Sequence, residues 1–260
     1  MIPKGFIIEW SKTAPWINNY QVEQDLVIER CLIEIFSDDI LRENLAFRGG
    51  TALHKLFLSP QVRYSEDIDL VQTSTGDIGY ILTRIRDRLA FMGEAGYHKK
   101  EHNNTLYYRF NSEYENIPLK LKFEINTREH FSTYPFAKIP FSLRSGYFSG
   151  NCIIRSYQIE ELLATKLRAL YQRKKGRDLF DLWYAISKAT IDFDKVVFSF
   201  KQYLTNENNL IRKKEFILNV EKKLRDVDFI RDVKGLLRSE SEFDVNQAWT
   251  TVRSKMIDKI

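Results

Sequence analysis

The chain contains only two cysteines, Cys31 and Cys152, in 260 residues. Both lie in apolar sequence, so we expect two buried thiols and neither a disulfide framework nor a cysteine-based metal site. No apolar run approaches the roughly 20 residues that span a bilayer, and the N-terminus lacks the long apolar core of a signal peptide. These absences exclude the disulfide-rich secreted and membrane-spanning classes, and we expect a cytoplasmic protein without a membrane partner.

What the chain does contain is typical of a folded protein. Apolar residues make up 43% and charged residues 29%, with 18 Phe and 13 Tyr, which suffices for one large domain or two modest ones. We find no internal repeat and no low-complexity segment. The formal charge is +5, and the basic residues cluster at 84–88, 99–100, 173–177, 212–214 and 222–225. Each cluster is explained by a solvated helix face, but together they favour a polyanionic partner such as RNA or a triphosphate.

Hydrophobic periodicity predicts an α+β first part and a helical second part. We expect helices at 19–37, 51–58 and 77–92, strands at 45–48, 64–71, 97–101, 106–110 and 119–126, and an irregular connection at 127–150. Helical spacing then continues through 157–174, 177–188, 193–204, 210–224, 227–237 and 243–258. The predicted architecture is a small mixed-sheet core with flanking helices over residues 1–155, followed by a helical domain over residues 156–260.

The sequence Gly49-Gly50-Thr51 stands between a predicted strand and a predicted helix. Glycines let the backbone adopt positive φ and approach a ligand closely, and the free N–H groups of a helix start attract anions. A tight turn without a ligand explains the same residues.

Two carboxylates, Asp67 and Asp69, alternate with Ile68 and Leu70 in the next strand. Alternation sends both carboxylates to one face of the sheet, where they suit a hard cation such as Mg²⁺. Crowded like charges raise each other's pKa unless a cation lies between them. A solvent-facing strand end is the alternative interpretation.

Glu124 lies on the polar face of the strand at 119–126, whose other face is apolar. If this strand neighbours the one that carries Asp67 and Asp69, Glu124 completes a set of three carboxylates. Pairing with Lys120 or Lys122 on the same face explains it equally well.

Lys166 lies near the apolar stripe of the helix at 157–174, where an ammonium group needs a partner. A triphosphate is one partner. The other is Asp178 or Asp181 in the following helix, which would make a structural ion pair.

The ordered set of these motifs resembles the AbiEii/AbiGii toxin family of nucleotidyltransferases, within the DNA polymerase β-like superfamily. The motifs are G-G-T-A-L-H-K-L at 49–56, R-Y-S-E-D-I-D-L at 63–70 and K-L-R-A-L-Y-Q-R-x-x-x-R-D-L-F-D-L at 166–182. The resemblance covers most of residues 10–190, and the helical C-terminus matches only in general character.

The resemblance implies roles for these residues. Gly49, Gly50 and Thr51 would hold the triphosphate of an NTP, with Ser65 contacting phosphate or positioning the loop. Binding of Mg²⁺ would fall to Asp67 and Asp69, with Glu124 a less secure third ligand. Lys166 would bind the triphosphate, and Asp178 would be a further catalytic residue.

The resemblance also implies a toxin of a type IV toxin–antitoxin or phage-defence system, with a separate cognate antitoxin. The expected reaction transfers NMP to an RNA, with a tRNA 3′ end as the favoured acceptor, and releases pyrophosphate. Two alternatives stay open. The acceptor could be a protein or small-molecule hydroxyl, or the chain could be a non-catalytic nucleotide-binding partner module.

Overall fold

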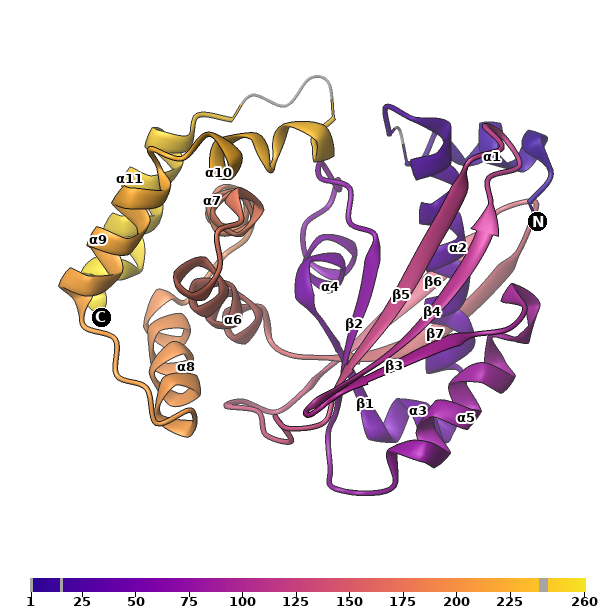
Figure 1. Ribbon diagram of the computed structural model, residues 1–260, viewed down its shortest axis with the longest axis horizontal. Coiled ribbons are helices and arrows are strands. Elements are labelled where there is room, and N and C mark those ends of the chain that lie inside the picture. Colours follow the sequence, from indigo (N-terminus) through magenta and orange to yellow (C-terminus); the bar gives the residue numbers. More distant parts are fainter. Residues whose placement is uncertain (1, 15, 239–242) are drawn as a thin grey trace. The chain divides into compact units, whose positions relative to one another are not determined.

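The computed structural model describes residues 2–14, 16–238 and 243–260, which form two compact units (Figure 1). The first unit comprises the residues up to Ala52, Tyr64–Ser132 and Phe136–Tyr157. The second comprises Leu53–Arg63, Thr133–Pro135 and the described residues from Gln158 onward. Helix α4 (Gly49–Leu56) begins in the first unit and ends in the second.

The first unit is built on a mixed sheet of seven described strands in the order β3-β4-β5-β2-β1-β7-β6. In the centre, β2 runs antiparallel to β1 and parallel to β5. Their bounds are β1 Leu45–Arg48, β2 Asp67–Gln72, β3 Gly96–Lys100, β4 Asn103–Asn111, β5 Pro118–Asn126, β6 Ala137–Arg144 and β7 Ser149–Ser156.

One face of this sheet is apolar and covered by helices. In β5, Leu121, Phe123 and Ile125 are fully buried, whereas Lys120 and its alternating neighbours face outward. The long helix α2 (Asn19–Phe36) packs against β5, β6 and β7. The shorter helices of this unit are α1 (Lys4–Trp10), α3 (Asp39–Asn44) and α5 (Ile78–Arg88), with a 3₁₀ turn at Ala90–Met92. The opposite face of β2 and β5 is left for polar side chains.

The second unit is helical in its described residues. Helix α6 (Ile159–Gln172) buries Leu163, Leu167 and Leu170 in one stripe and packs against its neighbours α7 (Gly176–Lys188) and α8 (Phe193–Asn206). Three further helices follow: α9 (Lys213–Lys223), α10 (Val227–Arg231) and α11 (Val245–Lys255). Two 3₁₀ turns, Lys234–Leu236 and Ile257–Lys259, complete the unit.

The predicted fold class is confirmed, but the prediction for residues 127–150 is wrong. Strands β6 and β7 form an antiparallel hairpin where the sequence indicated an irregular connection. Pro140 lies in β6, the edge strand of the sheet, where a residue without an N–H is tolerated. Gly150 pairs with Leu143 inside the ladder instead of breaking it.

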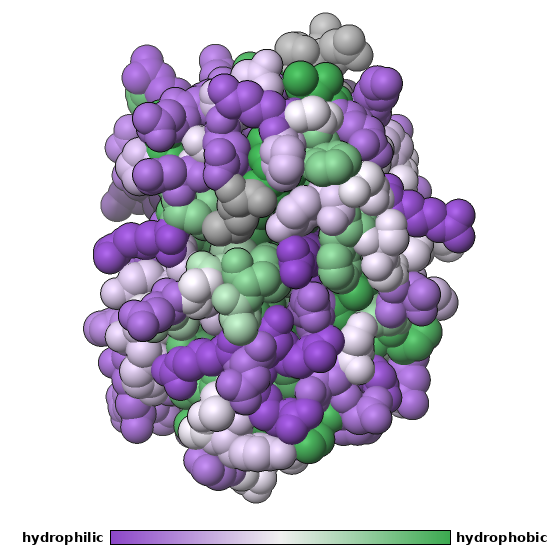
Figure 2. Space-filling view, turned by 90° about the vertical axis from the view of Figure 1, so that its right-hand side faces the viewer, coloured by the Kyte–Doolittle hydropathy of each residue, from purple (hydrophilic) through white to green (hydrophobic). Residues whose placement is uncertain are grey.

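None of the described helices combines the length and apolar composition that a membrane span requires. Hydrophilic side chains predominate on the surface drawn in Figure 2, with apolar residues in scattered groups. Both cysteines are free thiols, Cys31 buried and Cys152 only half-buried.

Candidate active site

The turn from β1 into α4 brings the backbone against a carboxylate. Gly49 has φ +82°, and a Cβ added there would lie 2.0 Å from Oδ2 of Asp69. Antiparallel pairing of β1 with β2 sets Arg48 opposite Asp69, which fixes this approach. Only glycine has both the required φ and the space, so the first glycine serves close contact between the turn and Asp69.

The two hydroxyl groups of the predicted phosphate site hold the start of α4 to the start of β2. Thr51 is buried, and its Oγ1 lies 2.5 Å from the carbonyl oxygen of Asp67 and 2.8 Å from Oγ of Ser65. The Thr51 hydroxyl has one proton, which it donates to the carbonyl while accepting from Ser65. The Thr51 hydroxyl is therefore engaged with the protein, and phosphate binding at the N–H groups of the first turn of α4 stays a prediction.

The acidic residues are brought to one face of neighbouring strands. Parallel pairing of β2 with β5 sets Asp69 beside Glu124 and Asp67 beside Lys122. Lys122 pairs with Asp67, with 3.6 Å between Nζ and Oδ1, and not with Glu124. Glu124 accepts a hydrogen bond of 3.4 Å from the Asn103 amide. The described residues nevertheless contain no group of three Asp, Glu, His or Cys side chains close enough to hold one metal ion, so a role for Glu124 as third ligand stays a prediction.

The surroundings of Asp67 change its acidity. Its pKa is raised to about 6, mainly by burial, with the Lys122 charge opposing the rise and the charges of Asp69, Glu66 and Glu124 adding to it. An unfolded Asp titrates near its ordinary value, so the buried charge opposes folding as pH rises from that value through about 6. The site has excess negative charge at neutral pH, and its oxygen donors suit a hard cation such as Mg²⁺.

Arg48 is a neighbour of the acidic pair that the sequence analysis did not single out. Burial lowers its pKa, but Glu129, Tyr157 and Asp69 outweigh burial and hold the pKa above the ordinary value. Its guanidinium group forms an ion pair with Glu129. Arg48 lies next to the acidic pair because β1 pairs with β2 in this register, and no pattern in the local sequence indicates that position.

In the second unit, Asp181 is the centre of a buried ion network. Its carboxylate is 0% exposed and lies 2.7 Å from Nε of Arg63, 2.8 Å from Nε2 of His54 and 2.8 Å from Nζ of Lys166. Burial alone would raise the pKa of Asp181, but the charges of Arg63, Lys166 and His54 hold it well below its usual range. The stability that this carboxylate contributes is present above its unfolded pKa and is lost only as pH falls through the lowered folded value.

Asp178 extends the same network. It lies 3.1 Å from Nζ of Lys166 and accepts from Nε of Arg173 at 2.7 Å. Lys166 thus has two carboxylate partners within its own unit, which is the ion-pair alternative that the sequence left open. The predicted site residues are divided between the units: Lys166 and Asp178 contact each other in the second unit, and the others lie in the first, namely Gly49, Gly50, Thr51, Ser65, Asp67, Asp69 and Glu124.

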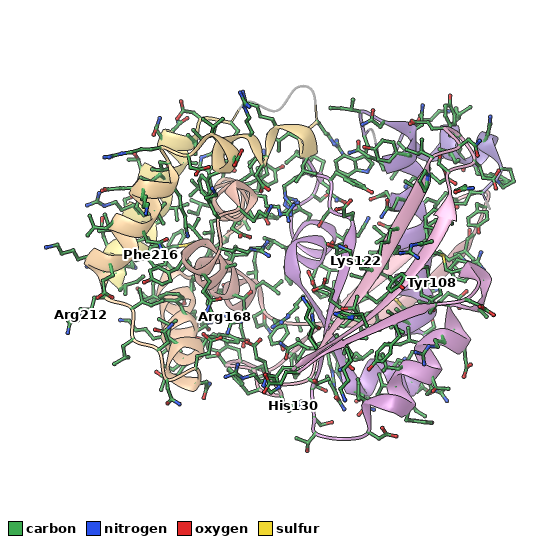
Figure 3. All side chains as sticks on the ribbon, viewed as in Figure 1. Tyr108, Lys122, His130, Arg168, Arg212 and Phe216 are labelled. Carbon is green, nitrogen blue, oxygen red and sulfur yellow. The ribbon has the colours of Figure 1, made fainter. Side chains whose placement is uncertain are left out.

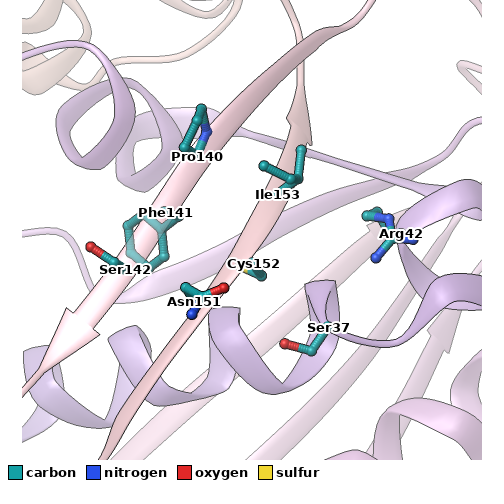
Figure 4. A pocket seen from close by; sticks show the side chains of 8 residues that line it. All are labelled: Ser37, Arg42, Pro140, Phe141, Ser142, Asn151, Cys152 and Ile153. Carbon is teal, nitrogen blue, oxygen red and sulfur yellow. The ribbon is translucent and has the colours of Figure 1, made fainter.

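A cavity of about 460 Å³ lies in the first unit at the β6–β7 hairpin (Figure 4). Its lining includes Arg42, Phe141 and Cys152 and no carboxylate. Burial raises the pKa of the Cys152 thiol to about 12, so the thiol stays protonated at neutral pH. We assign no chemistry to this cavity.

A double-mutant cycle tests the contact between Gly49 and Asp69. Gly49→Ala should lower the melting temperature, because the added Cβ forces the carboxylate aside as well as straining the backbone. In an Asp69→Ala background, the loss of unfolding free energy caused by Gly49→Ala should be smaller by about 1 kcal/mol or more. Gly93→Ala is the control, because Gly93 also has positive φ but open space around it. Equal losses for Gly49→Ala in both backgrounds would contradict the contact.

The ion network of the second unit makes a separate prediction. Asp181→Asn removes the shared partner of three buried cationic or donor groups and should cost about 3 kcal/mol or more, or roughly 10 °C in melting temperature. Lys174→Met removes one partner of the surface pair Lys174–Asp226 and should change it by no more than about 2 °C. Thermal denaturation followed by circular dichroism measures both. Similar small changes in the two variants would show that the network does not stabilise the unit.

Comparisons with known proteins identify the family of this chain and structures with a similar fold. The family profile described as the nucleotidyl transferase AbiEii toxin of type IV toxin–antitoxin systems matches residues 30–254. JHP933 from Helicobacter pylori has a similar fold, with TM-score 0.60 and 17% identity over 92% of this chain and 90% of that one. The MenT4 nucleotidyltransferase toxin of Mycobacterium tuberculosis H37Rv gives TM-score 0.61 and 16% identity over 95% and 98%. A search of curated protein sequences finds no match. The length of the profile match shows that the chain belongs to the AbiEii family of nucleotidyltransferase toxins of type IV toxin–antitoxin systems.

Proposed function

We propose that this nucleotidyltransferase moves NMP from an NTP to the 3′-hydroxyl of an RNA, with a tRNA 3′ end as the favoured acceptor. The new bond joins the RNA O3′ to the α-phosphorus, and the bond from the α-phosphorus to the bridging oxygen breaks, so that pyrophosphate leaves. The observation that carries the proposal is the Asp69 carboxylate lying against Gly49 at the start of a helix, with the Asp67 carboxylate on the same face. That arrangement sets oxygen ligands for a cation next to N–H groups for phosphate.

The residues of the first unit divide the work by their chemistry. The N–H groups from Gly49 to Thr51 donate hydrogen bonds to the β- and γ-phosphates. Asp67 and Asp69 hold the cation, and a carboxylate of this pair accepts the proton of the attacking hydroxyl. When bound, Mg²⁺ supplies charge neutralisation at the phosphates. The assignments of Lys166 to the triphosphate and of Asp178 to catalysis rest on the family resemblance and stay predictions.

The biological setting is part of the same proposal. The family is one of toxin–antitoxin systems, so we infer that a cognate antitoxin protein restrains the enzyme. We also infer that the enzyme acts in the cytoplasm as part of phage defence. NTP and tRNA are both available there. The following assay distinguishes the RNA acceptor from the alternatives, which are another acceptor or nucleotide binding without turnover.

Incubation with radiolabelled NTPs, Mg²⁺ and either total RNA or total protein tests the proposal. The wild type should label RNA and release pyrophosphate, whereas Asp67→Asn and Asp69→Asn should each lose about 100-fold or more of the rate, because the cation loses a ligand. Glu66→Gln is the matched control, since Glu66 is exposed and adjacent, and it should retain most of the activity.

Undiminished labelling by Asp67→Asn would overturn the assignment of the acidic pair. Labelling confined to protein would replace the RNA acceptor, and tight NTP binding without pyrophosphate release would favour the non-catalytic alternative.

A further inference from the structure

The polar face of the sheet continues outward from Asp67 across three more strands. Directly paired residues share a face, and one such row runs from Asp67 on β2 through Lys122 on β5 and Tyr107 on β4 to Gly96 on β3. Figure 3 labels Lys122, the member of this row that lies on β5. With strands about 4.8 Å apart, Tyr107 lies roughly 10 Å from Asp67 across the sheet. The reacting carboxylates and the aromatic ring therefore belong to one continuous surface of the first unit.

The Tyr107 ring is held in place by a glycine, and two cations lie over it. A Cβ added to Gly96 would lie 2.1 Å from Cζ of Tyr107, so the ring lies over the glycine backbone. The Lys120 ammonium is 4.4 Å and the Arg109 guanidinium 5.0 Å from the ring centroid. Tyr107 is partly exposed, and both cations are exposed. We call Tyr107, Arg109 and Lys120 the aromatic–cation platform.

The two cations of the platform are placed unfavourably for folding alone. Arg109 and Lys120 are directly paired across β4 and β5, and like charges directly opposite destabilise a sheet. Within the part of the chain that the structure describes, neither has an acidic side chain at ion-pair distance. An anion between them relieves the repulsion, so the pair has the charge expected of a phosphate contact.

Strand order decides which substrate this platform serves. The turn that offers N–H groups to the triphosphate follows β1, on one side of β2, whereas β5, β4 and β3 extend on the other side. In this arrangement the phosphates of the NTP bind at the turn that follows β1. The platform lies on the side left for the molecule that supplies the attacking hydroxyl.

We propose that the aromatic–cation platform binds the single-stranded 3′ segment of the RNA acceptor, an inference that rests on the proposed function. A base stacks on the guanidinium plane of Arg109, which lies over the Tyr107 ring, and Lys120 contacts the phosphate beside it. Aromatic rings with nearby cations bind single strands in this way with little sequence preference. The strand then leads its 3′-hydroxyl along the Lys122 row toward Asp67.

Fluorescence anisotropy with a 5′-labelled single-stranded RNA, in the absence of NTP, tests the platform. Tyr107→Leu should raise the Kd about tenfold, and Tyr107→Phe should stay within about twofold because it keeps the stacking surface. Lys120→Gln and Arg109→Gln should each weaken binding and lower the slope of log Kd against log salt by about 0.7. Melting temperatures verify that each variant is folded.

Matched controls come from the same unit. Tyr80→Leu removes an exposed tyrosine that also has an arginine beside it, and Lys138→Gln removes an exposed lysine on the β6 edge. Both should bind RNA as the wild type does. Equal losses in platform and control variants, unchanged binding in all platform variants, or no RNA binding by the wild type would each overturn the proposal.

A transfer assay separates this inference from the proposed function. The platform variants should raise KM for RNA about tenfold while the KM for NTP stays unchanged. If the wild type binds RNA through the platform but labels no RNA, the transfer proposal fails and the platform stands. If RNA is labelled with the same KM by Tyr107→Leu, the platform fails and the transfer proposal stands.

Discussion

The close approach of the Asp69 carboxylate to Gly49 is the constraint on which the site in the first unit depends. The antiparallel register of β1 and β2 places the acidic strand beside the glycine turn, and the parallel register of β2 and β5 adds Lys122 and Glu124 on the same face. Each register follows from burying the apolar side of the strand, because a slip by one residue would move every carboxylate to the covered face. Packing of the core and placement of the chemistry are therefore the same requirement in this unit.

The carboxylates of Asp181 and Asp67 lie in opposite charge environments. In the second unit, the buried carboxylate of Asp181 is paired with the buried cationic groups of Arg63 and Lys166. In the first unit, burial raises the pKa of Asp67, and the charges of Asp69, Glu66 and Glu124 add to that rise against the opposing charge of Lys122. The like-charged pair of Arg109 and Lys120 is the cationic counterpart on the same face. Stability given up at such places is typical of binding sites, where a ligand supplies the missing charge.

The sequence predicted what local patterns determine. Alternation in 119–126 gave the buried and polar faces of β5, and the spacing of Asp67 and Asp69 gave their common side. Long-range pairing has no local signal: the partners of Asp181 at Arg63 and His54 are 118 and 127 residues away. The β6–β7 hairpin was missed because Pro140 indicates a break in a central strand but is tolerated at an edge. The contact between the Tyr107 ring and Gly96 likewise becomes apparent only when the pairing of β3 with β4 is known.

Thermal denaturation of the wild type and Asp67→Asn tests the central claim, that crowded carboxylates await a cation. In chelator at about pH 8, the variant should melt about 2–4 °C higher, because it removes a half-buried charge that destabilises the fold by about 1 kcal/mol after allowance for solvent screening. The gap should narrow at about pH 4.5, where Asp67 is protonated in the folded protein. Addition of Mg²⁺ should raise the melting temperature of the wild type and not that of the variant. Equal melting temperatures at the higher pH, with Mg²⁺ acting alike on both proteins, would contradict the account.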